Sequence, residues 1–237
     1  MKNSTKEIIN EINTYRDESK AAFLPRFFKT GKGEYGEGDQ FIGVVVPNLR
    51  IVAKKHFDAD FDTLRELLAS PYHEYRLTAL LALTYRYAKL KDHASRETCV
   101  NFYVSQVDAI NNWDLVDLSC YKILGHWLFD KDKQLLYDWA KENHLWKQRI
   151  AIISCMHFVK QGEFKDALAI ADLLQHHPHD LIHKAVGWIL REIGKEDEQL
   201  LVDYLTPRYK EMPRTMLRYA IERFEEGKRK AFLNSTI

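Results

Sequence analysis

The sequence predicts an all-α fold, and three observations support this prediction. Apolar residues recur at i, i+3, i+4 and i+7 along most of the chain. The 10 glycines and 6 prolines concentrate between these periodic segments, where helices end. No segment combines two-residue alternation with flanking hairpin turns, as a β-strand would. We therefore expect helices almost throughout the chain.

The expected helices follow the periodic segments in chain order. N-terminal helices lie within residues 1–42, together with a glycine-rich acidic loop. The later segments are 61–69, 74–90, 96–110, 115–129, 133–142, 149–161, 164–175, 182–193, 199–210 and 214–224. A chain of 237 residues can bury a core large enough for one array of repeats. We expect a single domain over 1–237, with repeats in 43–226 and a tail at 227–237.

The stretch from Lys29 to Phe41 interrupts the helical pattern. Its glycines at 31, 33 and 36 match the GxGxxG spacing of dinucleotide-binding loops. However, no strand precedes the stretch, and its carboxylates would repel a pyrophosphate. We interpret it as a flexible loop before a helix at Pro47.

Cations recur at a nearly regular spacing near the starts of apolar helices. Arg76, Arg149, Lys184 and Arg218 occupy comparable positions, with Asp117 in the intervening unit, at steps of 41, 32, 35 and 34 residues. Such periods are typical of paired-helix repeats of the HEAT type, which stack into a solenoid with a concave groove. A cation near a helix start opposes the helix dipole, so this stripe favours an anion lying across the groove.

The composition limits the possible partners and cofactors. Lys and Arg total 35 against 34 for Asp and Glu, so binding to nucleic acid must depend on a local patch. The three cysteines lie far apart, and the run His176-His177-Pro178-His179 is broken by proline, so we expect no disulfide framework, metal or other cofactor. Without an apolar signal core or a membrane-spanning stretch, the chain is expected to be cytoplasmic.

The segment NWDLVD at 112–117 holds the candidate catalytic pair. Trp113 and Asp117 are four residues apart, so a helix displays an indole and a carboxylate on one face. Asp114 competes with Asp117 for the acidic role, although its place before an apolar run suggests a helix cap. On the residues alone, core positions are favoured for Trp113 and Trp188, because large aromatic residues on helices usually lie in the core.

These segments together carry a family likeness. The chain resembles the AlkD-like DNA alkylation-repair glycosylases, which are built from HEAT-like repeats. The resemblance covers residues from about 43 to 226, and its matching stretches are GVVVPNLR at 43–50, NWDLVD at 112–117, WKQRIA at 146–151 and KAVGWILRE at 184–192.

The resemblance implies an enzyme that binds duplex DNA in its groove and excises N3- or N7-alkylated purines without a cofactor. We expect a monomer. By motif position, Asp117, Trp113 and Trp188 would act at the lesion, and Arg149 would hold the DNA backbone. Arg191 would add a phosphate contact, and the stripe adds Lys184, Arg76 and Arg218. Because the alkylated purine is already cationic, a carboxylate that stabilises positive charge on the sugar could suffice. Indole faces attract such a cation as well.

A second function stays open at this point. The same groove could belong to a non-catalytic HEAT-like module that binds DNA structures or a protein partner. The combination of Trp113, Asp117, Trp188 and Arg149 favours catalysis, because a scaffold has no need of a carboxylate among cations. No lysine stands out as a Schiff-base nucleophile, so we expect a monofunctional glycosylase without a lyase step.

Overall fold

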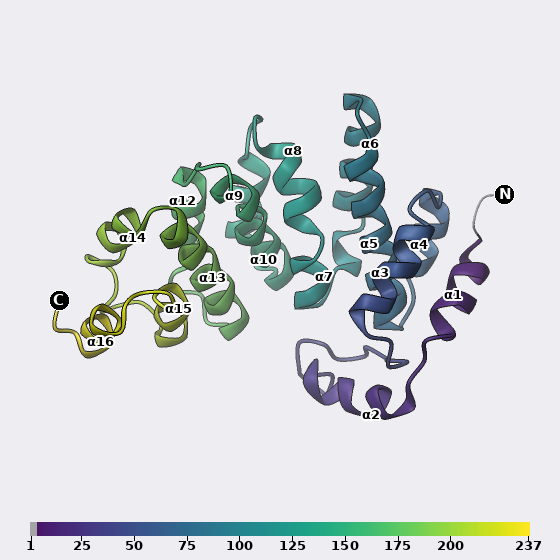
Figure 1. The fold of residues 1–237 in the computed structure, drawn as a ribbon, viewed down its shortest axis with the longest axis horizontal. Helices are drawn as coiled ribbons and strands as arrows, with labels where there is room; N and C mark the ends of the chain where they lie inside the picture. Colours follow the sequence, from purple (N-terminus) through teal and green to yellow (C-terminus); the bar gives the residue numbers. More distant parts are fainter. Residues whose placement is uncertain (1–3) are drawn as a thin grey trace. The chain divides into compact units, whose positions relative to one another are not determined.

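The computed structural model describes residues 4–237 as helices joined by loops (Figure 1). Within these residues there is no β-strand, although Gln40 and Tyr72 form an isolated bridge. The all-α prediction is therefore confirmed. The chain divides into two compact units, unit 1 (Met1–Ile123) and unit 2 (Leu124–Ile237). The single-domain organisation stays a prediction.

Unit 1 begins with two helices and continues with paired helices. Side-chain caps start several of them: Ser4 caps α1, Asp17 caps α2 and Asp60 caps α4. The helix expected at Pro47 is confirmed as α3, with Pro47 in its first turn. The elements are α1 (Thr5–Asn13), α2 (Glu18–Phe27), α3 (Val46–Lys55), α4 (Phe61–Leu68), α5 (His73–Lys89), α6 (His93–Ser105), η1 (Val107–Ala109) and α7 (Trp113–Asp117).

A π-helical turn, η2 (Tyr121–Gly125), spans the boundary, and unit 2 continues as helix pairs. Its helices are α8 (His126–Leu128), α9 (Gln134–Lys141), α10 (Leu145–Ser154), α11 (Met156–Val159), α12 (Lys165–Leu174), α13 (Asp180–Glu196), α14 (Glu198–Leu205), α15 (Arg214–Ala220) and α16 (Glu226–Asn234). The residues expected as a tail, 227–237, thus contain all of α16 except its first residue.

The prediction of one helix over 115–129 is wrong. The chain forms α7, then η2, then α8 across that range. The Ser119 hydroxyl donates to the Leu115 carbonyl at 2.5 Å, and the Ser119 N–H bonds to Val116 rather than continuing the four-residue ladder. A serine that competes for backbone carbonyls in this way bends or ends a helix.

The paired-helix pattern predicted from the spacing is present in each unit. In unit 1, α4 and α3 pack against α5; in unit 2, α9 packs against α10, and α12 and α15 pack against α13. The five repeat positions lie on second helices: Arg76 on α5, Asp117 on α7, Arg149 on α10, Lys184 on α13 and Arg218 on α15. The apolar faces of these helices supply most of each unit's core.

Candidate functional site

Helix α7 presents the predicted catalytic pair on its outer face. Asn112 starts the helix, and its side-chain oxygen accepts the Trp113 N–H at 2.8 Å. Leu115 and Val116 are fully buried, whereas Trp113 and Asp117 are only half-buried. The two candidate side chains therefore lie on the less buried side of one short helix.

The competing carboxylate, Asp114, has a different position. It is 4% exposed, and its Oδ2 hydrogen-bonds to His73 Nε2 at 2.8 Å. Asn112 is the helix cap, so the interpretation of Asp114 as the cap is wrong. Asp114 sits in the first turn of α7 and is sealed from solvent. Only Asp117 of the two carboxylates is accessible to a ligand.

Asp117 also acts electrostatically on a buried phenol beneath α7. Tyr103 is fully buried in α6, and its hydroxyl bonds to Ser119 Oγ at 3.1 Å. Burial raises the pKa of Tyr103 well above its usual range, and unfavourable electrostatic interactions with Cys120 and Asp117 add to the effect. The inner side of α7 therefore rests on a phenol that stays neutral at any physiological pH.

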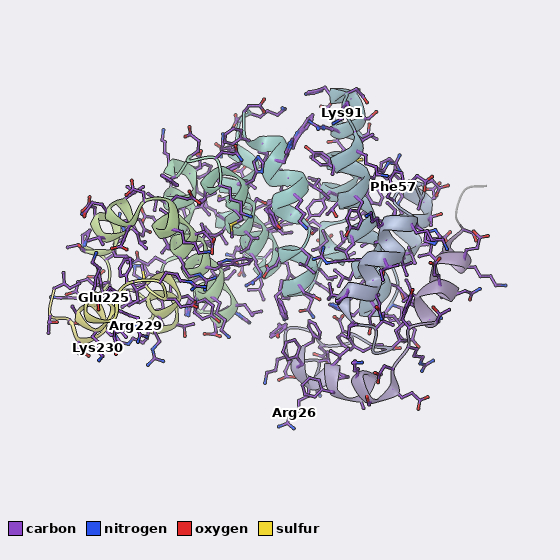
Figure 2. All side chains as sticks on the ribbon, in the orientation of Figure 1. Arg26, Phe57, Lys91, Glu225, Arg229 and Lys230 are labelled. Carbon is purple, nitrogen blue, oxygen red and sulfur yellow. The ribbon has the colours of Figure 1, made fainter. Side chains whose placement is uncertain are left out.

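An aromatic cluster surrounds Trp113. The Phe28 ring stacks on the indole with centroids 5.4 Å apart, and Phe27 meets the indole edge at 6.0 Å. Phe23 stacks on Phe27 in turn, and these two rings are 60% and 51% exposed. The side chain of Arg26 projects outward from the same helix (Figure 2). The sequence analysis did not identify this exposed aromatic surface. No residue of α2 is fully buried, so its aromatic side chains do not contribute to the core.

A buried polar network lies behind α7. His73 bonds through Nδ1 to Asp39 Oδ2 at 3.1 Å and through Nε2 to Asp114. Asp39 Oδ1 accepts from Arg76 Nη2 at 2.6 Å, and Asp39 Oδ2 accepts from Asn112 Nδ2 at 3.1 Å. All five residues are at most 7% exposed.

This network corrects the prediction that Arg76 contacts DNA. The Arg76 side chain is buried and paired with Asp39, so it cannot reach a phosphate without breaking a buried ion pair. The Gly-rich loop was expected to be flexible, but the bonds from Asp39 to Arg76 and His73 anchor it to unit 1. We remove Arg76 from the candidate phosphate contacts.

Opposing effects set the charges in this network. Burial disfavours ionisation of Asp39, but hydrogen bonds and attraction from His73 and Arg76 outweigh it and lower the pKa of Asp39. Burial likewise disfavours the cationic form of His73. Attraction and hydrogen bonding from Asp114 and Asp39 nevertheless raise the pKa of His73 to about 9. His73 is therefore an imidazolium at neutral pH.

Helix α13 carries the second candidate tryptophan. Trp188 is half-buried, and its Nε1 donates to Glu192 Oε1 at 3.2 Å, one turn further along. The preceding residue, Gly187, faces α15 so closely that a Cβ there would lie 2.5 Å from both the Met216 carbonyl oxygen and Tyr219 Cβ. Glycine at 187 thus fixes the face of α13 on which Trp188 lies.

The candidate cations of unit 2 differ in accessibility. Arg149 is 5% exposed, and its Nη1 donates to the Leu181 carbonyl in the first turn of α13. Lys184 pairs with Asp180 at 2.6 Å and keeps a side chain that is 40% exposed. Arg218 is exposed. The equivalent repeat positions therefore do not share one environment.

Arg191 is held between two carboxylates. Its Nε lies 3.5 Å from Glu192 Oε1, and its Nη1 bonds to Glu222. Glu192 also accepts from Trp188 and Lys195, so the tryptophan and the arginine share one acidic neighbour. A phosphate that approached Arg191 would compete with Glu222.

Each unit thus gathers part of the predicted site. Unit 1 brings Trp113 and Asp117 together on α7, and unit 2 gathers Arg149, Lys184, Trp188 and Arg191 on or beside α13. In residues 4–237, no group of three or more His, Cys, Asp or Glu side chains is arranged to hold a metal ion. Over the same residues, no helix has the length and apolar character to cross a membrane.

Comparisons with known proteins identify the family of the chain. The sequence profile of the DNA alkylation repair enzyme family matches residues 8–224, so the chain belongs to that family and the resemblance found in the motifs is confirmed. A search among curated proteins gave no significant match.

Two solved structures share the fold. A predicted DNA alkylation repair enzyme from Enterococcus faecalis has a TM-score of 0.68 at 14% identity, covering 89% of this chain and 97% of that one. AlkD2 from Streptococcus mutans has a TM-score of 0.55 at 15% identity, covering 88% and 99%. The helical fold class is therefore that of DNA alkylation repair proteins, and DNA is the partner that the family implies.

Proposed function

We propose that the protein is a monofunctional DNA glycosylase that excises cationic N3- or N7-alkylated purines from duplex DNA. The observation that carries this proposal is the different exposure of the two carboxylates on α7. Asp114 is 4% exposed and held by His73, whereas Asp117 and Trp113 share the outer face. A purely structural α7 would have no need of a second, outward carboxylate beside an indole.

In the proposed chemistry the enzyme stabilises positive charge on the sugar and does not need to protonate the base. Alkylation at N3 or N7 gives the purine a positive charge, so the base can depart without protonation. Positive charge then develops at C1′ of the deoxyribose, where the Asp117 carboxylate stabilises it and orients the attacking water. The Trp113 face adds a cation–π contribution. No lysine is assigned to a covalent step, so the DNA strand stays intact.

Neighbouring aromatic residues in unit 1 support DNA contact beside Trp113. Phe23 and Phe27 are more than half exposed, and Arg26 lies between them in sequence on α2. Exposed rings stack on nucleobases or pack on sugars, and arginine pairs with phosphate. We assign α2 to the strand that carries the lesion.

In unit 2, the proposal assigns Trp188 to the sugar and Lys184, Arg191 and Arg218 to phosphates. Arg149 receives two linked roles. Its hydrogen bond to Leu181 holds the first turn of α13, which also bears Lys184. A direct phosphate contact by Arg149 requires the side chain to turn outward from its buried position.

One observation favours the competing function, a non-catalytic module that binds DNA. Arg76 and Arg149 are buried, and Arg191 is paired with Glu192 and Glu222. Fewer of the candidate cations are therefore accessible to phosphates than the sequence predicted. Such a surface could bind DNA weakly without presenting a lesion to Asp117.

Base release from defined duplexes separates the two functions. One duplex carries a single 7-methylguanine, and a matched duplex carries hypoxanthine, a neutral lesion whose departure needs protonation. We expect free 7-methylguanine, an intact abasic strand and no hypoxanthine release. Binding of both duplexes without any release would establish the module instead. Release of hypoxanthine would contradict the mechanism, because it requires a general acid.

A further inference from the structure

Helix α7 is too short to fix its own orientation. Five residues form little more than one turn, and isolated helices of this length are unstable in water. The buried side chains of Leu115 and Val116 attach α7 to the core. Apolar contacts are not directional, so they leave the rotation of the helix about its axis weakly specified. Directional contacts at the start of α7 must set which way Trp113 and Asp117 face.

Those directional contacts converge on His73. Both ring nitrogens of His73 bond to carboxylates, Asp39 from the loop and Asp114 from α7. A neutral imidazole has one donor, whereas an imidazolium has two, so two carboxylate partners select the charged form. Within residues 4–237, Asp114 Oδ1 is buried without a hydrogen-bond partner, so this carboxylate depends on His73 for its compensation.

Aromatic ring contacts connect His73 to Trp113. The imidazole contacts the rings of both Phe28 and Phe41, with centroid distances of 4.7 and 5.0 Å. Phe28 in turn stacks on the Trp113 indole. Aromatic faces stabilise a cation that lies against them. His73, Phe28 and Trp113 therefore form a continuous series of ring contacts whose charged end is His73.

The loop side of the network is fixed by the first turn of α5. The Glu74 carboxylate accepts the N–H groups of Ile42 at 3.1 Å, Gly43 at 2.8 Å and Val44 at 3.3 Å. Gly43 has a φ of +83°, and a Cβ there would lie 1.9 Å from the Asp17 carbonyl oxygen, so only glycine fits. The loop and the start of α2 are thus held as one piece beside His73.

We propose that the His73 imidazolium is the positioning residue of the site: it joins the Gly-rich loop to α7 and so orients Trp113 and Asp117 towards the DNA. The catalytic consequence rests on the proposed function, whereas the structural consequence does not. His73 touches no reacting atom in this scheme. It acts through Asp114 on the helix and through Phe28 on the indole.

The proposal has a definite pH dependence. The charged groups facing His73 are Asp39 from the loop, Asp114 from α7, and Arg76 and Glu74 from α5. Protonated His73 and Arg76 balance Asp39 and Asp114. Because the pKa of His73 rises from 6.5 to about 9 on folding, its stabilisation is complete below pH 6.5 and is lost as the pH rises through about 9. The orientation of Trp113 is lost with it.

Fluorine NMR of the full chain containing 5-fluorotryptophan tests this directly. The Trp113 resonance is assigned with Trp113→Phe, and the Trp188 resonance in unit 2 serves as an internal control. We expect the Trp113 line alone to titrate with a midpoint near 9, which is the pKa of His73. His73→Gln should shift the Trp113 line at every pH and abolish the step.

A matched variant controls for general loosening of unit 1. His56 is 4% exposed and pairs with Glu11 at 2.7 Å, so His56→Gln removes a comparable buried contact away from α7. It should leave the Trp113 line unchanged. Equal shifts in the His56 and His73 variants overturn the proposal. If His73→Gln does not fold, titration of the parent chain still decides, because a Trp113 line that is unmoved through pH 9 contradicts it.

Base release supplies the catalytic readout. His73→Gln should lower the single-turnover rate about tenfold or more while the duplex Kd stays within about twofold, because small displacements cost rate more than binding. If the parent releases no base but the Trp113 line still reports His73, the proposed function fails and the positioning role stands. If the parent is active and His73→Gln retains its full rate, the positioning role is overturned.

Discussion

Helices α7 and α13 each carry a candidate tryptophan, but they are stabilised in different ways. Helix α7 has five residues and depends on a buried polar network that reaches the loop through Asp39 and α5 through His73. Helix α13 has 17 residues, of which seven are buried. At Gly187 its backbone lies in close contact with α15. The comparison shows that a short helix takes its orientation from charged neighbours, whereas a long one takes it from packing.

The largest expected effect breaks the anchor of α7. Asp39→Asn removes one of the two carboxylates that balance His73 and Arg76, leaving a buried excess of positive charge. Removing one partner of a buried ion pair costs about 3 kcal/mol or more in the free energy of unfolding. Urea denaturation measures this cost. As a control, Asp62→Asn changes an exposed carboxylate paired with Arg65 and should cost less than about 1 kcal/mol. Equal costs in the two variants would contradict a stabilising role for the buried network around Asp39.

The next effect tests the packing of α13. Gly187→Ala places a Cβ against Met216 and Tyr219 on α15, so the unfolding free energy should fall by about 2 kcal/mol. In α16, a Cβ at Gly227 meets only the side-chain end of Glu225, which caps that helix and can shift, so Gly227→Ala should cost much less than Gly187→Ala. Both variants can be compared by urea denaturation. A stabilising Gly187→Ala would show that α13 and α15 are not closely packed.

A smaller effect concerns DNA affinity at unit 2. Lys184→Ala and Arg218→Ala each remove one proposed phosphate contact, so each should flatten the slope of log K against log salt by about 0.9. Lys165 lies exposed at the start of α12, the first helix of the same pair as α13, and Lys165→Ala should leave the slope unchanged. Titrations of labelled duplex at several salt concentrations measure these slopes. If the Lys184, Arg218 and Lys165 variants all have the same slope, Lys184 and Arg218 do not contact phosphates, and the predicted stripe is not the DNA-binding surface.

The smallest effect concerns the paired arginine on α13. Glu222→Gln removes the carboxylate that competes for Arg191, so duplex affinity should rise about twofold, because exposed ion pairs are weak. Glu226→Gln removes a comparable carboxylate, one that pairs with Lys230 on α16, and controls for the change in net charge. Equal gains in both variants would indicate a general charge effect and leave Arg191 without a role in binding.

The sequence predicted the helices, their pairing and the shared face of Trp113 and Asp117, because these depend on residues close together in the chain. It could not predict the fate of Arg76, since its partner Asp39 lies 37 residues away in a loop that local rules treat as flexible. Repeat position likewise did not reveal that Arg149 is buried. Periodicity shows which residues are equivalent, but exposure depends on how helices and loops pack around each one.

The break after α7 was missed for a related reason. The apolar period runs on past Asp117, and nothing in that period marks Ser119 as the residue whose hydroxyl takes the Leu115 carbonyl. The exposed rings of Phe23 and Phe27 were missed because the resemblance begins at about residue 43. Helix α2 lies before that point and had to be recognised from the structure alone.

The assignment of the catalytic carboxylate is tested most directly by a pair of isosteric variants. Single-turnover release of 7-methylguanine is measured at protein concentrations that saturate the duplex, for Asp117→Asn and for Asp114→Asn. We predict that Asp117→Asn lowers the rate by about 10²–10³ without weakening the fold, because it removes the charge opposite the developing cation. Asp114→Asn should destabilise α7 and lose less rate. An active Asp117→Asn beside an inactive but folded Asp114→Asn would contradict it.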